Sequence, residues 1–241
     1  MGRVIAFIFG LISYIVFFGT FLYAIGFVGN VFVPKSIDSG GETSSVSALL
    51  INVVLLLIFG LQHSVMARPA FKRTWTQFVP KVIERSVYVL FASSALILLF
   101  WRWRPMTDSV WNIENSVGRY VLYGIFASGW LIVLLSTFMI NHFDLFGMRQ
   151  VYYHSRGTTP PEMNFQTRAF YKIVRHPIML GFIIAFWATP AMTVGHLLFA
   201  GVTTVYILVA IQFEERDLVS AHGETYKAYK QKVGMLVPRK S

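Results

Sequence analysis

The chain has 241 residues, of which 55% are hydrophobic and only 13% are charged, and its formal net charge is +10. A mean hydropathy of +0.58 excludes an ordinary soluble domain of this length, which needs far more polar surface. The absence of cysteine excludes disulfides, thiolate metal sites and a cysteine nucleophile. No Lys/Arg-rich run is interleaved with aromatic residues, so we expect anionic lipid rather than nucleic acid to balance the positive charge.

The apolar residues fall into long blocks that predict membrane-spanning helices. The first block is much longer than the core of a signal peptide and lacks a small-x-small cleavage site, so we expect it to be a retained span. The following blocks are close to the ~20 residues that cross a hydrocarbon core. The four predicted spans cover about residues 4–33, 46–66, 86–101 and 117–140.

A fifth apolar region, about 178–213, is too long for one ordinary span and is interrupted by Pro190 and Gly195. We interpret it as a hairpin of two helices, about 178–191 and 196–213. The alternative is one kinked helix, because proline removes a backbone hydrogen bond from a helix interior. The sequence therefore predicts an all-α, polytopic membrane helical bundle. It would have five or six transmembrane segments, a cytoplasmic C-terminal helix and a single domain over 1–241.

Lys and Arg are distributed unevenly between the two predicted sides of the membrane. Seventeen of the 21 lie in the N-terminus, the second loop, the segment 141–176 and the tail, which the hairpin places on one side. The other side carries Lys35, Arg102, Arg104 and Arg119. The positive-inside rule then predicts that both termini are cytoplasmic. A single kinked helix would move the tail across the membrane and weaken this bias.

Polar residues that could take part in catalysis or binding lie at the span ends on that same side. They are Gln62, His63, Asn141, His142, Asp144, Arg175, His176 and the run Glu214–Asp217. A hairpin returns 214–217 to the depth of 175–177, so we expect one polar pocket built from four helix ends. Each feature also has a purely structural interpretation, such as an interfacial histidine, an N-cap or a solvated ion-paired helix face. No HExxH or clustered histidine set is present, so we expect no metal.

Three motifs near the C-terminus resemble the membrane methyltransferases related to isoprenylcysteine carboxyl methyltransferase and phospholipid methyltransferases. These motifs are RHPIMLG at 175–181, the pair Glu214–Glu215 and GETYKAY at 223–229. The resemblance implies that S-adenosylmethionine is held at the cytosolic membrane face by the elements 141–177 and 214–238. It implies seven cofactor-binding residues: Arg175, His176, Pro177, Gly181, Glu214, Glu215 and Tyr226.

Two further motifs, LQHSVMARP at 61–69 and NHFDLFGMRQV at 141–151, make the chain similar to the bacterial methanethiol S-methyltransferase family, with more distant NnrU-like relatives. The resemblance implies methyl transfer from S-adenosylmethionine to a small thiol, turning methanethiol into dimethyl sulfide in the inner membrane of a bacterium. Such a transfer is an in-line displacement, which requires alignment of the reactants and exclusion of water. The oligomeric state does not follow from the sequence.

The thiolate, rather than the thiol, is the reactive nucleophile, so a base beside the thiol would assist the reaction. We hypothesise that His142 or His63 accepts the proton and that Asp144 orients the imidazole. Arg149 would favour the thiolate or anchor the cofactor. The alternative is that the run Asn141–Asp144 merely caps the fourth span.

Other functions fit parts of the same pattern. A lipid amine or a prenylcysteine carboxylate would be a longer acceptor for the same chemistry and predicts a wide lateral opening. A non-enzymatic NnrU-like accessory protein would not bind S-adenosylmethionine. A transporter predicts ionisable residues within the spans, whereas this sequence concentrates them at the span ends.

Overall fold

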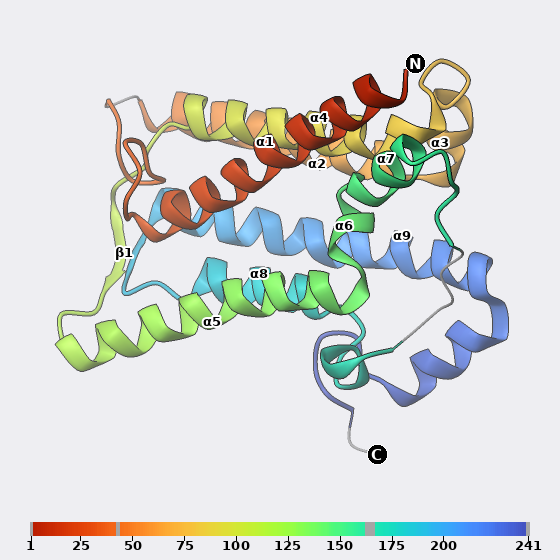
Figure 1. The fold of residues 1–241 in the computed structure, drawn as a ribbon. Coiled ribbons are helices and arrows are strands. Elements are labelled where there is room, and N and C mark those ends of the chain that lie inside the picture. Colours follow the sequence, from red (N-terminus) through yellow and green to blue (C-terminus); the bar gives the residue numbers. More distant parts are fainter. Residues whose placement is uncertain (1, 42–43, 162–166, 240–241) are drawn as a thin grey trace. The chain divides into compact units, whose positions relative to one another are not determined.

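The computed structural model describes residues 2–41, 44–161 and 167–239, and it is predominantly helical (Figure 1). The α-helices are α1 (Arg3–Gly29), α2 (Ser45–Ala67), α3 (Pro69–Trp75), α4 (Lys81–Arg102), α5 (Ser116–Ile140), α6 (His142–Leu145), α7 (Met148–Ser155), α8 (Pro177–Trp187) and α9 (Val194–Lys232). A 3-10 helix, η1 (Ala169–Lys172), and two short strands, β1 (Ser109–Asn112) and β2 (Ala191–Thr193), complete the described structure.

Five helices in these described ranges are long and apolar enough to cross a membrane: α1, α2, α4, α5 and α9. Helix α8 is equally apolar but has only 11 residues. The predicted all-α membrane fold with five or six apolar segments is confirmed. Most ends of the predicted spans agree with the helices to within a few residues. Helix α4 begins five residues before the predicted 86, because its first turn contains charged residues and hydropathy detects only the apolar part of a helix.

Local sequence signals explain where several helices begin and end. The side chains of Ser44 and Thr193 cap α2 and α9 by accepting hydrogen bonds from the backbone N–H groups of residues three positions later. Pro69 and Pro177 occupy the first positions of α3 and α8, where a missing N–H costs nothing. Asn30 adopts the left-handed conformation that ends α1, so the predicted first span stops short of residue 33.

The chain forms two compact units, and the first comprises α1–α4 together with α6 and α7. Within it, α4 packs against both α1 and α2, and α7 packs against α1. A side chain at Gly10 would meet Val151 of α7 at 2.6 Å, so the glycine is what lets α1 and α7 approach. This unit carries His63, His142, Asp144 and Arg149. Residues 162–166, inside the predicted cofactor element 141–177, lie outside the described residues.

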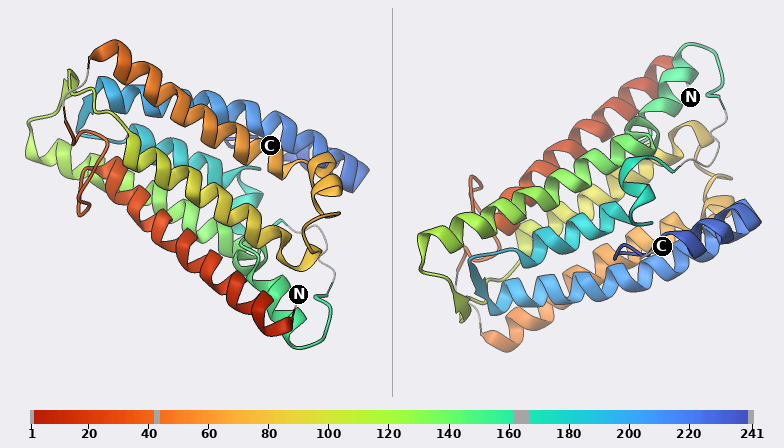
Figure 2. Two further views of the ribbon diagram at one scale, coloured as in Figure 1. Left: turned by 90° about the horizontal axis from the view of Figure 1, so that it is seen from above. Right: turned by 90° about the horizontal axis from the view of Figure 1, so that it is seen from below.

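The second unit comprises β1, α5, η1, α8, β2 and α9. Helices α5 and α8 lie side by side (Figure 2), and their backbones meet at two glycines. A Cβ on Gly181 would lie 2.7 Å from the carbonyl oxygen of Gly129, which only a glycine avoids. The strands β1 and β2 form an antiparallel ribbon in which Ser109 pairs with Thr193 and Asn112 with Ala191.

The apolar region 178–213 is divided between α8 and α9, with residues 188–193 between them. The two helices run antiparallel: Trp187 Nε1 donates to Thr204 Oγ1 at 2.9 Å, and His196 Nε2 lies 2.8 Å from the carbonyl oxygen of Phe186. Helix α9 does not end near residue 213 as predicted. It continues to Lys232, with one non-helical residue at Gly223 (φ 55°, ψ −130°), because no glycine or proline interrupts residues 202–222.

Candidate functional site

A cluster of charged side chains in the second unit is centred on Glu215 of α9. Its Oε1 atom accepts hydrogen bonds from Arg175 Nε at 2.7 Å and His176 Nε2 at 3.2 Å. Its Oε2 atom lies 2.6 Å from Lys230 Nζ, which comes fifteen residues later in the chain, beyond the non-helical Gly223. Since an ionised carboxylate only accepts hydrogen bonds, His176 Nε2 is the donor in its contact. Glu215 is buried, and every strong contact of its carboxylate is to a nitrogen donor.

The backbone around residue 175 explains how this cluster is assembled. The chain after α9 returns along residues 174–176, where Arg175 N donates to Gly234 O at 2.8 Å and His176 N to Met235 O at 3.2 Å. The guanidinium of Arg175 also donates to the carbonyl oxygens of Lys230 and Val233. Arg175 thus ties the start of α8 to the end of α9, as the hairpin interpretation required. The predicted proximity of 175–176 to 214–215 is present within this unit.

Glu214 and Glu215 are adjacent in sequence but differ sharply in exposure. The side chain of Glu214 is 43% exposed and that of Glu215 is 5% exposed, and Glu214 Oε2 lies 3.6 Å from His176 Nδ1. His176 therefore sits between the two carboxylates. The carboxylate of Glu215 is bonded to partners inside the protein, whereas the side chain of Glu214 is partly open to solvent.

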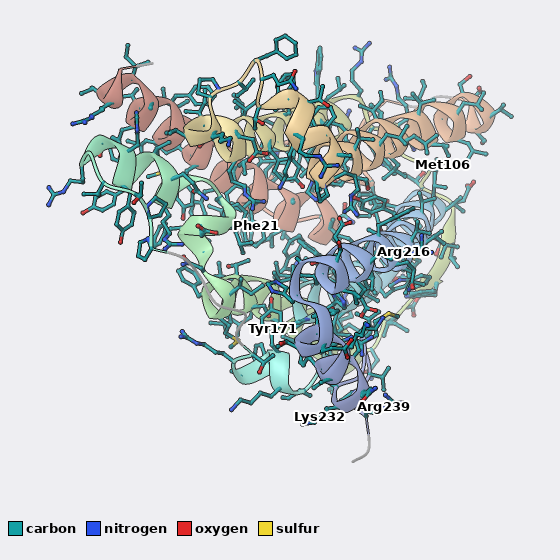
Figure 3. The ribbon with its side chains drawn as sticks, turned by 90° about the vertical axis from the view of Figure 1, so that its right-hand side faces the viewer. Phe21, Met106, Tyr171, Arg216, Lys232 and Arg239 are labelled. Atoms are coloured by element: carbon teal, nitrogen blue, oxygen red, sulfur yellow. The ribbon has the colours of Figure 1, made fainter. Side chains whose placement is uncertain are left out.

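Three tyrosines surround this ionic cluster. Tyr226 is fully buried, its ring lies 5.7 Å from that of Tyr229, and Tyr229 Oη donates to the carbonyl oxygen of Tyr171 at 2.5 Å. Burial, followed by the negative charge of Glu214, raises the pKa of Tyr171 well above its ordinary value of 10.0. Tyr171 therefore stays neutral. Figure 3 shows it on η1, in the same unit as the labelled Lys232 and Arg239 near the chain end.

Two of the predicted cofactor-binding residues have clear structural roles in α8. Pro177 is buried at the first helical position, and Gly181 makes the close contact with Gly129 of α5. The start of a helix explains the proline at 177, and the close packing of two helices explains the glycine at 181. Their contribution to cofactor binding stays a prediction.

In the first unit, His142 begins α6, where the Asn141 side chain accepts a hydrogen bond from Asp144 N at 3.3 Å. The imidazole is buried, its Nε2 atom lies 2.8 Å from Tyr14 Oη, and the ring of Phe146 is 4.8 Å away. Burial lowers the pKa of His142 below its ordinary value of 6.5. At neutral pH the imidazole is therefore uncharged and able to accept a proton.

Asp144 and Arg149 form an ion pair of their own. Arg149 donates to Asp144 Oδ1 at 3.2 Å, and Gln150 Nε2 donates to the same oxygen at 3.2 Å. A second guanidinium nitrogen donates to the carbonyl oxygen of Pro161. The orienting contact to His142 that the sequence suggested for Asp144 is made by the hydroxyl of Tyr14.

His63, on α2, is also paired with a tyrosine. The hydroxyl of Tyr88 on α4 lies 3.0 Å from the two ring nitrogens of His63, and Phe59 stacks on the imidazole with ring centroids 5.3 Å apart. Tyr14 and Tyr88 were missed by sequence reasoning because nothing in the neighbouring sequence marks a tyrosine within an apolar span as the partner of a distant histidine. Lys230 could have been noticed, since it directly follows the tail motif at 223–229.

Within the described ranges, no three His, Asp or Glu side chains are grouped as metal ligands. The groups that could carry chemistry in the described residues include the charged side chains around Glu214 and Glu215 and the two histidine–tyrosine pairs.

Comparison with known proteins finds relatives that match this chain over nearly its full length and share the name methanethiol S-methyltransferase. No family model matches the chain, and no solved structure does. The chain is 55% identical to methanethiol S-methyltransferase of Crocosphaera subtropica, covering 99% of this chain and 93% of the relative. It is 56% identical to the Mycobacterium tuberculosis methanethiol S-methyltransferase, over 99% of this chain and 98% of the relative. Nurim of Danio rerio is 30% identical over 178 residues, covering 70% of this chain and 64% of that protein. At such identity over almost the entire length, the chain belongs to the methanethiol S-methyltransferase family of enzymes, as its motifs predicted.

Proposed function

We propose that this chain transfers a methyl group from S-adenosylmethionine to methanethiol and so produces dimethyl sulfide at a membrane surface. The observation that carries the proposal is the ion cluster of Arg175, His176, Glu214, Glu215 and Lys230. The names of relatives at 54–56% identity support the choice of acceptor.

The cluster offers the donors and acceptors that the amino acid head of S-adenosylmethionine requires. That head carries an ammonium and a carboxylate. Glu214, the more exposed carboxylate, can accept hydrogen bonds from the ammonium, and Lys230 has three N–H donors, of which Glu215 uses one. The buried Glu215 is then a positioning residue that holds Arg175, His176 and Lys230 in place. Bound S-adenosylmethionine would supply an electrophilic methyl group on its sulfonium.

The proton of the thiol needs an acceptor, and His142 suits that role best. Its buried imidazole is neutral, and the hydroxyl of Tyr14 fixes the orientation of the ring. The S–H bond would break as the proton passes to the imidazole, and the sulfur would use the released electron pair to bond the methyl carbon. The bond between that carbon and the sulfonium sulfur would break at the same time, and its electron pair would leave with S-adenosylhomocysteine, a neutral thioether. His63 is the alternative acceptor. Arg149 lies in the same unit as both histidines, but Asp144 balances its charge, so we assign deprotonation of the thiol to a histidine and not to the field of this ion pair.

The five long apolar helices and the family together indicate an integral membrane protein. We propose that it lies in the inner membrane of a bacterium, with both termini in the cytoplasm, as the distribution of Lys and Arg predicts. The natural absence of cysteine makes this easy to test. Single-cysteine variants Ser39→Cys and Lys227→Cys should react with a membrane-impermeant maleimide from opposite sides of intact cells and inverted vesicles. Labelling of both from the same side would contradict the topology.

The central experiment is methyl transfer from radiolabelled S-adenosylmethionine by the purified full chain. Methanethiol, hydrogen sulfide and extracted membrane lipids are offered in parallel, and calorimetry measures the affinity for S-adenosylmethionine separately. We expect label in dimethyl sulfide. Label in lipid alone would replace the acceptor but keep the donor, and no affinity for S-adenosylmethionine would reject the proposed donor.

A further inference from the structure

The first unit has a basic hollow that the proposed methyl transfer does not use. It is open to solvent, has a volume of about 600 Å³ and lies where α3 meets the start of α4. We call it the α3 hollow; its lining residues are Lys72, Arg73, Thr76, Gln77, Lys81 and Glu84. Three of these side chains are cationic and one is acidic, so the hollow favours an anion.

The position of the α3 hollow in the fold indicates where such an anion comes from. Helix α2 ends at Ala67 and α4 begins at Lys81, and these two candidate spans pack against each other with α3 connecting them (Figure 1). The hollow therefore lies at the common end of two spans. The phosphate groups of a bilayer lie at this depth, just beyond the hydrocarbon that the apolar helices cross.

Aromatic residues beside the hollow support the same placement. Phe71 and Trp75 on α3 stack with their ring centroids 5.7 Å apart. Phe78 follows α3 and is 79% exposed, so its ring is free to contact the acyl chains of a lipid. Aromatic rings next to Lys and Arg at a span end are typical of the membrane interface.

We propose that the α3 hollow binds the headgroup of an anionic membrane phospholipid. Lys72, Arg73 and Lys81 balance the phosphate, and Glu84 can accept a hydrogen bond from a headgroup hydroxyl such as that of phosphatidylglycerol. Phe78 lies against the acyl region. A soluble phosphate would gain from the cations but would make no use of the exposed ring.

The test measures lipid retention by the delipidated full chain in detergent micelles, using native mass spectrometry. Dioleoylphosphatidylglycerol, dioleoylphosphatidylcholine and inorganic phosphate are titrated separately. We expect the wild-type chain to retain phosphatidylglycerol more tightly than phosphatidylcholine. The triple variant K72Q/R73Q/K81Q should lower the affinity for phosphatidylglycerol roughly ten-fold or more, since each cation near an anionic headgroup contributes separately.

A matched variant, R156Q/K172Q/K232Q, removes three exposed cations elsewhere and should change the affinity by less than about two-fold, since those cations lie outside the hollow. Equal losses in both triple variants would mean that net charge alone attracts the lipid, and the site would be rejected. Equal retention of phosphatidylcholine, or inorganic phosphate binding as tightly as the lipid, would also overturn the proposal. If the first triple variant does not fold, the single variants Arg73→Gln and Lys81→Gln replace it, because both side chains are exposed.

Discussion

The two units hold their histidines in contrasting ways. In the second unit, His176 lies between the carboxylates of Glu214 and Glu215, within a network that includes Arg175. In the first unit, His142 and His63 are each paired with a tyrosine hydroxyl among aromatic rings. A charged network suits recognition of a zwitterionic ligand, whereas a neutral, buried imidazole suits proton transfer. These contrasting environments are the basis for the two roles we propose, ligand binding for the charged network and proton acceptance for a buried imidazole.

Replacing the proposed proton acceptor should have the largest effect on turnover. We expect His142→Gln to lower kcat for dimethyl sulfide formation by roughly 10²- to 10⁴-fold, the usual contribution of a general base. The affinity for S-adenosylmethionine, measured by calorimetry, should not change. His63→Gln is the matched control. A larger loss of kcat in His63→Gln would indicate that His63 is the proton acceptor. Near-normal kcat in both variants would show that neither histidine has this role.

Glu215→Gln should damage stability as well as activity. It removes the negative charge that balances Arg175 and Lys230 while keeping the shape of the side chain. Breaking a buried ion pair from one side costs roughly 3 kcal/mol, and we expect a clear fall in the thermal unfolding midpoint in detergent. Glu224→Gln breaks an exposed pair with Lys227 and should leave the midpoint almost unchanged. Similar midpoints for both variants would contradict the structural importance of Glu215.

Glu214→Gln tests whether this carboxylate binds the ligand, with little expected effect on the stability of the fold. Because Glu214 is partly exposed and its contact to His176 is long, at 3.6 Å, the variant should unfold much like the wild type. Loss of one charge-assisted hydrogen bond should weaken the binding of S-adenosylmethionine by roughly 10- to 100-fold in calorimetry. Unchanged affinity would remove Glu214 from the proposed binding site.

Tyr14→Phe tests the orienting contact to His142. It removes only the hydroxyl, so we expect kcat to fall roughly ten-fold, in line with the loss of one hydrogen bond, while KM for methanethiol changes little. Tyr88→Phe makes the same change at His63 and serves as the control. Equal effects of the two substitutions on kcat would show that the histidine–tyrosine pairs are not functionally distinct.

The smallest expected effect is the pH dependence that His142 gives to the stability of the folded chain. Burial lowers the pKa of His142 in the folded chain below 6.5, so the unfolded chain binds this proton at a higher pH than the folded chain does. Stability should therefore fall as the pH decreases from about 6.5 toward the folded pKa. Unfolding midpoints of the wild type and His142→Gln should converge over this interval. A constant difference between them would contradict the lowered pKa.

The sequence predicted much of the second unit because its motifs are local. The proline at 177, the pair Glu214–Glu215 and the hairpin between them require only hydropathy and helix-start signals, and the structure brings 175–176 beside 214–215. The partners of His142 and Asp144 could not be found in this way. Asp144 lies two residues from His142, yet its carboxylate is bonded to Arg149 and Gln150.

By itself, the sequence determined the membrane class, the approximate spans, the basic bias and the family motifs, because hydrophobicity, charge and proline act over a few neighbouring residues. Only the tertiary structure decided which side chains are partners. It placed the hydroxyl of Tyr14 beside His142, brought Lys230 to Glu215, and left Glu214 partly exposed while it buried Glu215. These outcomes depend on which helix faces pack together, and two adjacent carboxylates on one helix acquire different roles because they point in different directions.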